Sequence, residues 1–320
     1  MKLIIQIPCY NEAETLPVTL NDLPRRIEGI DSIEILVIDD GSTDNTAEVA
    51  GRAGVHHVVR ITSNLGLAGA FAAGLDACLK LNADIIVNTD ADNQYNGADI
   101  VKLVRPILEK KADIVVGARD IKSIDHFSLM KKLLQRVGSS LVRSVSHTTI
   151  ADTTSGFRAY SREAAMRLNV VSDFTYTLET IIQAGTSGLA ITHVPVRTNP
   201  KLRESRLFRS TGQYVVRSLS TIIRIYTMYK PLRVFTAVGG VLFGIGLILD
   251  LRFLYYFFAL SHEPTGHIQS LIVAAVFMII GFQVFMFGLL ADLTAKNRKL
   301  MEDTLLRTKK LEFEQEKKHD

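Results

Sequence analysis

The sequence predicts an α/β domain with a mostly parallel sheet, followed by an amphipathic helix and two transmembrane helices. Short runs rich in Ile and Val alternate with amphipathic helical patterns over the first 120 residues. Continuous apolar strands separated by helices are typical of a parallel sheet that is covered on both faces. A basic amphipathic stretch begins near residue 207, and two long apolar runs follow it.

The composition permits a large core and disfavours some functions. The chain has 320 residues, of which 47% are hydrophobic and 22% charged, enough for one large domain with additional segments. A formal net charge of +4 is too small to indicate nucleic-acid binding. Cys9 and Cys78 lie in apolar patterns without metal-ligand spacing, so we expect core residues in a reducing compartment. The apolar run in "MKLIIQIPCYNE" is too short for a signal peptide.

The expected elements place three polar clusters at one edge of the sheet. Strands are expected at residues 3–7, 33–39, 57–61, 84–88 and 113–117, and helices at 12–28, 43–53, 67–80 and 97–111. The clusters "PCYNE", "DDGSTDNT" and "TDADNQY" follow three of these strands. Ligands of open α/β sheets bind at the carboxyl ends of the strands, so the clusters predict a binding site there.

The stretch "VNTDADNQYNG" predicts a cation site. Asp90 and Asp92 follow a buried strand, and Gln94 comes two residues later. Side chains at alternate positions of an extended chain point to the same side. Two carboxylates at close range destabilise each other unless a cation lies between them, and Mg²⁺ and Mn²⁺ prefer oxygen ligands. The alternative is a solvated turn before a helix capped by Asn near residue 97.

The stretch "VIDDGSTDNTAEVA" predicts a turn at Gly41, after which Ser, Thr or Asp caps the next helix. Capping does not explain the doubled Asp39 and Asp40 at the end of the strand. A carboxylate there can accept hydrogen bonds from a nucleobase and a ribose. No Walker loop occurs, and no Gly-x-Gly-x-x-Gly follows the first strand, which disfavours a nicotinamide enzyme or an ordinary kinase.

Residues 207–231 and the following apolar runs predict membrane attachment. Arg217, Arg224 and Lys230 lie among Val, Leu, Ile and Tyr, as in an interfacial helix. The alternative is a basic helix packed on the soluble domain. Of the two apolar runs, 271–290 has the length of a membrane span and shows no polar face, which argues against a buried soluble hairpin.

The first apolar run, 234–260, spans a membrane only if Asp250 and Arg252 lie near the far interface or pair with each other. Lys and Arg residues precede the first run and follow the second, whereas the connecting "SHEPTGH" contains neither. The positive-inside rule therefore places the domain and both termini in the cytoplasm.

Four segments follow from these patterns: a domain at 1–206, a juxtamembrane helix at 207–231, a transmembrane hairpin at 232–292 and a charged tail at 293–320. The tail is expected to be a solvated or oligomerising helix.

Six motifs occur in the order found in one enzyme family. They are "IPCYNEAETLP", "VIDDGSTDNT", "SNLGLAGAFAAGL", "TDADNQY", "VGARD" and "DTTSGFRAYSREA". Over about residues 3–206 the chain resembles glycosyltransferase family 2. It is most similar to the membrane-anchored polyprenol-phosphate enzymes, such as dolichol-phosphate mannose synthases and undecaprenyl-phosphate glucosyltransferases. The resemblance implies a GT-A fold, which is Rossmann-like.

The resemblance also implies residue roles. The nucleotide-binding positions are Pro8, Tyr10, Glu12 and Asp40. The metal and diphosphate site is Asp90, Asp92 and Gln94. The lipid-phosphate positions are Arg119, Arg136 and Ser140. Arg136 and Ser140 are four residues apart, which puts them on one helix face, although Arg136 alone also fits a surface arginine.

One segment departs from the family pattern. Many relatives carry an Arg several residues before Gly-x-Ser-Lys, after the last strand of the domain. This chain reads "TNPKLRESRLFRS", without the glycine and with Pro200 in the place of that Arg. We expect Arg203 or Arg206 to contact the donor diphosphate instead.

The implied reaction is an inverting, metal-dependent transfer of a sugar from a UDP- or GDP-linked donor to a polyprenyl monophosphate. Mg²⁺ or Mn²⁺ neutralises the leaving diphosphate. The acceptor phosphate, whose second pKa is about 6, is already ionised and needs arginines rather than a strong base. Asp152 and Glu179 are candidates for orienting roles or for purely structural ones.

Two other functions are weighed against this reaction. A processive polysaccharide synthase typically carries Gln-x-x-Arg-Trp and more membrane helices, but this chain contains no Trp. A non-catalytic membrane scaffold could retain the fold, but it would have no reason to keep the costly carboxylate pair in "DADNQ".

Overall fold

The structure is a computed structural model of the whole chain. It describes residues 1–119, 150, 152–170, 176–200, 220, 223–224, 226–259 and 268–319. Four predicted site residues lie outside these ranges: Arg136, Ser140, Arg203 and Arg206. Most of the predicted juxtamembrane helix also lies outside them. The chain divides into two compact units, one of Met1–Ile222 with Thr304–Asp320 and one of Ile223–Asp303.

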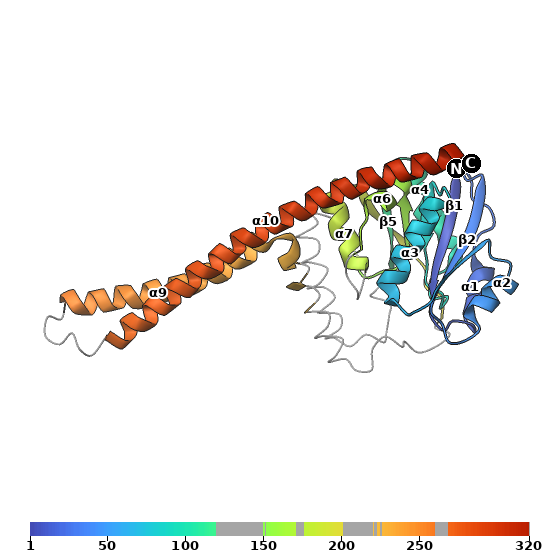
Figure 1. Cartoon of the computed structure of the whole chain (residues 1–320). Helices are drawn as coiled ribbons and strands as arrows, with labels where there is room; N and C mark the ends of the chain where they lie inside the picture. The colour runs from blue at the N-terminus through green and yellow to red at the C-terminus, as the bar shows by residue number, and fades with distance from the viewer. Residues whose placement is uncertain are drawn as a thin grey trace. The chain divides into compact units, whose positions relative to one another are not determined.

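The first unit contains a seven-stranded sheet in the order β3-β2-β1-β4-β6-β5-β7. Strands β1, β2 and β5 are labelled in Figure 1, among the helices of this unit. The strands are β1 (Lys2–Cys9), β2 (Ser32–Asp40), β3 (His57–Ile61), β4 (Ile85–Asn88), β5 (Ile114–Arg119), β6 (Arg158–Ser161) and β7 (Ile191–Val196). Of these described strands, only β6 runs antiparallel to its neighbours, β4 and β5. The five strands expected from the sequence are confirmed, and the mostly parallel sheet is the predicted one.

Helices cover both faces of this sheet. They are α1 (Leu16–Asp22), α2 (Thr46–Arg52), α3 (Gly66–Lys80), η1 (Gly97–Asp99), α4 (Ile100–Leu108), α6 (Arg162–Arg167) and α7 (Thr177–Thr186). One core cluster joins β1 and β4 to residues of α1, α2 and α4, such as Leu103. The other joins the sheet to α3, α6 and α7 around Phe71. Cys9 and Cys78 are buried and unpaired, as expected of core cysteines.

The topology brings several polar segments to one edge of the sheet. Parallel strands β1, β2, β4 and β5 end there, and the antiparallel strand β6 begins there. Asn88, the last residue of β4, pairs with Arg158, the first residue of β6. Arg119 ends β5. The described segments that carry Tyr10, Asp40, Asp90 and Arg119 therefore converge at this edge.

The second unit contains two long apolar helices that are candidate membrane spans. They are α9 (Pro231–Ala259) and α10 (Ile268–His319), with mean hydropathies of 2.1 and 2.5 in their apolar windows. Glycines let the two backbones approach closely: a Cβ on Gly239 would lie 2.7 Å from the carbonyl oxygen of Gly281. A Cβ on Gly246 would likewise lie 2.8 Å from the carbonyl oxygen of Ala274. Small residues at such crossings are typical of helices packed in a membrane.

The end of α10 belongs to the first unit, which differs from the solvated or oligomerising tail expected from the sequence. Phe313 is only 5% exposed and joins the core cluster around Phe71, with Leu306 packed beside it. The Arg162 guanidinium carbon lies 5.6 Å from the centre of the Phe313 ring. Leu306 and Phe313 are seven residues apart and so share one helix face. In the sequence, the residues of this narrow apolar face are surrounded by charged residues.

Candidate active site

In the segment after β4, Gln94 contacts Asp92, and the Asp92 carboxylate lies near enough to Asp90 to act on its ionisation. The Gln94 side-chain amide donates to Asp92 Oδ2 at 2.7 Å, and its backbone N–H donates to Oδ1 at 3.2 Å. Asn93 has a φ of 55°, which turns the chain sharply between the two. Gln94 thus orients the Asp92 carboxylate, and its role as a metal ligand stays a prediction.

The electrostatics of this segment fit a divalent cation. Burial and, next, the Asp92 carboxylate raise the pKa of Asp90 to about 7. A nearby cation would restore its charge, and carboxylate oxygens suit Mg²⁺ or Mn²⁺. Within the described ranges no three His, Cys, Asp or Glu residues form a metal cluster. Mg²⁺ sites commonly combine one or two protein carboxylates with phosphate oxygens of a substrate.

The expected capping role of Asn near residue 97 is also present. The Asn96 side chain accepts a hydrogen bond from the backbone N–H of Ala98 at 3.2 Å, at the start of η1. Neither Asp90 nor Asp92 takes part in this cap. Helix capping therefore accounts for Asn96 and leaves the two carboxylates to another role.

Hydrogen bonds hold the loops after β1 and β2 against each other. The backbone N–H of Asn11 donates to Ser42 Oγ at 2.9 Å, and the Asn11 side-chain oxygen accepts from the Thr43 N–H at 2.8 Å. The backbone N–H of Glu12 donates to Thr46 Oγ1 at 2.9 Å. Asn11 has a φ of 55°, which asparagine tolerates better than most residues. Hydrogen bonds from the loop after β2 and the start of α2 therefore hold the loop after β1 in place.

The predicted nucleotide-binding positions flank this junction. Pro8 is buried in β1, whereas Tyr10, just after β1, is 45% exposed. Asp40 is buried at the end of β2, where its Oδ1 accepts from the Leu65 N–H at 2.7 Å, and burial raises its pKa. Asp39, which was not among the predicted positions, has a buried Oδ2 without a hydrogen-bond partner in the described chain.

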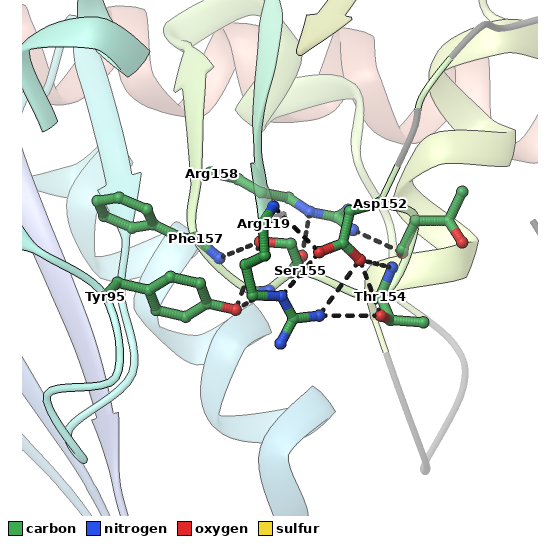
Figure 2. Close-up of polar contacts among 9 residues, drawn as sticks. Tyr95, Arg119, Asp152, Thr154, Ser155, Phe157 and Arg158 are labelled. Atoms are coloured by element: carbon green, nitrogen blue, oxygen red, sulfur yellow. Dashed lines mark hydrogen bonds and ion pairs between the residues drawn. The ribbon is translucent and has the colours of Figure 1, made fainter. Parts of the chain in front are cut away.

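Arg119 and Asp152 form a buried ion pair at the same edge of the sheet (Figure 2). Arg119 Nε lies 2.7 Å from Asp152 Oδ2, and Arg119 Nη2 lies 3.2 Å from Oδ1. Nη2 also donates to Thr154 Oγ1 at 3.1 Å. The Asp152 side chain is fully buried, and that of Arg119 is 21% exposed. The arginine is therefore fixed on one side and partly open on the other.

This pair favours the ionised form of Asp152. Burial opposes its ionisation, but the charge and hydrogen bonds of Arg119 lower its pKa below the ordinary value. A carboxylate that stays ionised and bonded is a poor general base near neutral pH. Of the two candidates for orienting roles, Asp152 thus contacts Arg119 directly. Glu179 is buried within α7 and accepts from Gln183 Nε2 at 3.4 Å.

A second arginine, Arg158, is fully buried and donates hydrogen bonds to the loop of residues 152–157. Arg158 was not among the predicted site residues. Nε donates to the Ser155 carbonyl at 2.7 Å, and Nη2 to the Thr153 carbonyl at 2.9 Å. Nη1 donates to Thr180 Oγ1 at 2.8 Å, which ties the loop to α7. Its position in the motif "SGFRAY" was visible in the sequence, but these partners were not.

Glycine is required in the same loop. A Cβ on Gly156 would lie 2.8 Å from Tyr176 Oη and 3.1 Å from Asp90 Oδ1. The Gly156 carbonyl in turn accepts from Asn88 Nδ2 at 2.9 Å. Residues 152–157 therefore lie against Asp90 on one side and hold Arg119 on the other. Residues 90–94 are called the cation-binding segment below, after their predicted role.

Comparisons with known proteins agree with this geometry. The model of the glycosyl transferase family 2 matches residues 4–168. Glycosyltransferase AglJ of Haloferax volcanii is 31% identical over 304 residues, covering 90% of this chain and 92% of that protein. The undecaprenyl-phosphate mannosyltransferase of Micrococcus luteus is 28% identical over 218 residues, covering 65% of this chain and 88% of that protein.

Solved structures show the same fold. Glucosyl-3-phosphoglycerate synthase from Mycobacterium tuberculosis, in complex with Mn²⁺, UDP and glucosyl-3-phosphoglycerate, superposes with a TM-score of 0.51 at 20% identity. The match covers 69% of this chain and 79% of that one. The sheet, the converging loops and the sequence matches lead to one conclusion: the chain belongs to glycosyl transferase family 2 and is a glycosyltransferase.

Proposed function

We propose that the protein transfers a sugar from a UDP- or GDP-linked donor to a polyprenyl monophosphate, with inversion at the anomeric carbon. The observation that carries the proposal is the position of the fixed arginine Arg119 and the carboxylates Asp90 and Asp92 at one edge of the sheet. Relatives named as undecaprenyl-phosphate and polyprenol-phosphate transferases support the choice of acceptor.

On the donor side, Asp90 and Asp92 would hold Mg²⁺ or Mn²⁺ through their carboxylate oxygens. When bound, the cation supplies Lewis-acid stabilisation of the leaving diphosphate. The Gln94 amide keeps Asp92 oriented. The nucleoside would occupy the junction of the β1 and β2 loops, beside Pro8, Tyr10, Glu12 and Asp40. Arg203 or Arg206 would contact the diphosphate.

On the acceptor side, Arg119 would bind the lipid phosphate. Its Nε and Nη2 are held by Asp152 and Thr154, and its Nη1 has no hydrogen-bond partner among the described residues. A guanidinium whose orientation is already fixed loses little entropy when it binds a phosphate. Arg136 and Ser140 would complete this phosphate site.

The acceptor supplies its own nucleophile. A phosphate monoester has a second pKa of about 6, so an oxygen anion is available near neutral pH without a protein base. Attack of that oxygen on the anomeric carbon, as the nucleotide diphosphate leaves from the opposite side, gives inversion in one displacement. The ionised, bonded state of Asp152 agrees with this mechanism, because no base is needed.

Helices α9 and α10 would anchor the enzyme in the bilayer that holds its lipid acceptor. The basic residues before α9 and after the apolar part of α10 support, under the positive-inside rule, a cytoplasmic position for the catalytic domain and both termini. The acceptor phosphate would then be presented at the cytoplasmic leaflet. Arg217, Arg224 and Lys230 would contact lipid headgroups, each contributing about 1 kcal/mol near an anionic surface.

The proposal is tested with the full-length protein purified in detergent. A panel of UDP- and GDP-linked sugars is incubated with undecaprenyl or dolichyl phosphate and Mn²⁺, and NMR gives the anomeric configuration of the lipid product. We expect one favoured donor, inversion, and loss of product with EDTA or in Asp92→Ala. Retention, or near-native turnover of Asp92→Ala, would refute the mechanism, and a polymeric product would favour the processive synthase.

A further inference from the structure

Tyr95 directly follows the cation-binding segment and is built into the core. Its side chain is 5% exposed, and its backbone forms an antiparallel bridge with Thr198 after β7. The backbone oxygen of Tyr95 also accepts from Asn199 Nδ2 at 3.3 Å. The residue is therefore held from two sides, which gives its side chain one fixed direction.

Figure 2 shows the Tyr95 ring beside Arg119 and Phe157, with the Tyr95 hydroxyl directed toward Ser155. The ring stacks on Phe157, with ring centres 4.9 Å apart and planes 20° apart. The Arg119 guanidinium carbon lies 5.9 Å from the centre of the Tyr95 ring, within the range of a cation–π interaction. The ring thus lies beside the guanidinium whose Nε and Nη2 are held by Asp152.

The Tyr95 hydroxyl reaches the same loop. Its oxygen accepts from the Gly156 N–H at 3.3 Å and from Ser155 Oγ at 3.4 Å. Gly156 itself lies against the Asp90 carboxylate, since a Cβ there would be 3.1 Å from Asp90 Oδ1. One side chain therefore connects three parts of the site, namely the cation-binding segment, Arg119 and residues 152–157.

We infer that Tyr95 is a positioning residue that fixes the acceptor arginine relative to the cation-binding carboxylates. The inference rests on the proposed role of Arg119 in binding the acceptor phosphate. In-line attack requires the phosphate and the anomeric carbon to be held at about 3–3.5 Å, and small displacements reduce the rate strongly. Tyr95 sets this separation because its backbone directly follows the segment of Asp90 and Asp92, while its side chain lies against Arg119.

The inference is tested with Tyr95→Phe, which keeps the ring and removes the hydroxyl, and with Tyr95→Leu, which removes both. Loss of the hydroxyl that accepts these two long, neutral hydrogen bonds, from the Gly156 N–H and Ser155 Oγ, predicts about a fivefold rise in the KM for polyprenyl phosphate in Tyr95→Phe. Loss of the stacking and cation–π contacts predicts a rise of about 30-fold or more in Tyr95→Leu. The affinity for the nucleotide sugar with Mn²⁺ should stay within about twofold of wild type in Tyr95→Phe.

The matched control is Ser161→Ala, which removes a hydroxyl that accepts from the Ala164 N–H at 3.1 Å, at the end of β6 opposite Arg158. This variant should leave the acceptor KM unchanged. An equal rise in Tyr95→Phe and Ser161→Ala would overturn the inference. A parallel loss of donor affinity in Tyr95→Phe would also overturn it, because that result indicates a general loss of structure.

Arg119→Ala separates failure of the inference from failure of the proposed function. If Arg119→Ala leaves the acceptor KM unchanged, the proposed phosphate site is wrong. If Arg119→Ala raises it and Tyr95→Phe does not, only the role of Tyr95 is wrong. The double variant should show no further rise over Arg119→Ala, since Tyr95 acts through Arg119, and additive effects would contradict this.

Discussion

Replacing Asp152 by Asn tests how the acceptor arginine is held. The Asp152 carboxylate accepts from Arg119 Nε and Nη2 and from the backbone N–H and hydroxyl of Thr154, at 2.7 to 3.2 Å. Asparagine is the same size but offers one acceptor oxygen and one NH₂ group. In either orientation the NH₂ faces a donor of Arg119 or Thr154. The variant therefore loses charge-assisted hydrogen bonds without creating a cavity.

The magnitude follows from the burial of this pair. Removing one partner of a fully buried ion pair costs about 3–5 kcal/mol of folding free energy. The Arg119 side chain is 21% exposed, so water compensates part of its charge, and we expect the low end, about 3 kcal/mol. A guanidinium without its carboxylate partner also samples other orientations. The loss of one charge-assisted bond, about 1.5–3 kcal/mol, predicts about a 10- to 100-fold fall in acceptor kcat/KM.

The assay measures kcat/KM for polyprenyl phosphate, nucleotide-sugar affinity and chemical unfolding of wild type and Asp152→Asn. Donor affinity should be unchanged, and Asp152→Glu should recover part of the acceptor kcat/KM. Unchanged acceptor kcat/KM in Asp152→Asn would refute the role of the pair.

The pH dependence of stability and of the reaction rate provides a second test of the role of Asp152. Because the pKa of Asp152 is lowered in the folded state, its stabilisation is fully present above the ordinary carboxyl pKa of about 3.9 and is lost as pH falls below that value. Asp152 should thus add no limb to the pH–rate profile near neutrality, where the acceptor phosphate titrates at about pH 6. A neutral limb that disappears in Asp152→Asn, with acceptor binding intact, would identify Asp152 as a base.

Three further variants test other parts of the structure. Gly156→Ala should weaken Mn²⁺-dependent donor binding in calorimetry, because its Cβ would press on Asp90; unchanged binding would contradict this. Phe313→Ala should lower the free energy of unfolding by about 3 kcal/mol and Phe313→Leu by less, whereas no change would show that the tail is undocked. Burial opposes ionisation of Asp99, but hydrogen bonds from Arg197 lower its pKa from 3.8 to about 2. Asp99→Asn should therefore lower the free energy of unfolding at pH 7, measured by thermal unfolding, by at most about 2 kcal/mol. That difference should shrink as pH falls from about 4 towards 2, and a constant difference would contradict the ionic role.

The sequence was sufficient to predict the sheet and to single out the acidic segment at its edge because both signals are local. Apolar runs that alternate with helical patterns specify a parallel sheet, and Asp90 and Asp92 lie two residues apart at the end of one strand. Asp40 could be found in the same way, from a doubled carboxylate that helix capping does not explain. In each case the informative residues are neighbours in the chain.

Other features could not be found in this way because they depend on contacts between distant segments. The ring of Tyr95 meets Phe157, and the side chain of Arg158 meets Thr180, only after the sheet has formed. The docked end of α10 was also missed, since Leu306 and Phe313 are isolated apolar residues in a strongly charged sequence. Their spacing of seven was visible, but its partner surface around Phe71 was not.

The proposed acceptor is a lipid monophosphate that is held by Arg119. In the most direct measurement, the full-length enzyme is incubated with Mn²⁺, its preferred labelled nucleotide sugar and three lipids of equal chain length. The lipids are polyprenyl phosphate, polyprenyl diphosphate and unphosphorylated polyprenol. We expect a single major product, polyprenyl-phosphate-sugar, with no transfer to polyprenol and strongly reduced formation in Arg119→Ala. Equal transfer to polyprenol, or wild-type product formation by Arg119→Ala, would contradict this proposal.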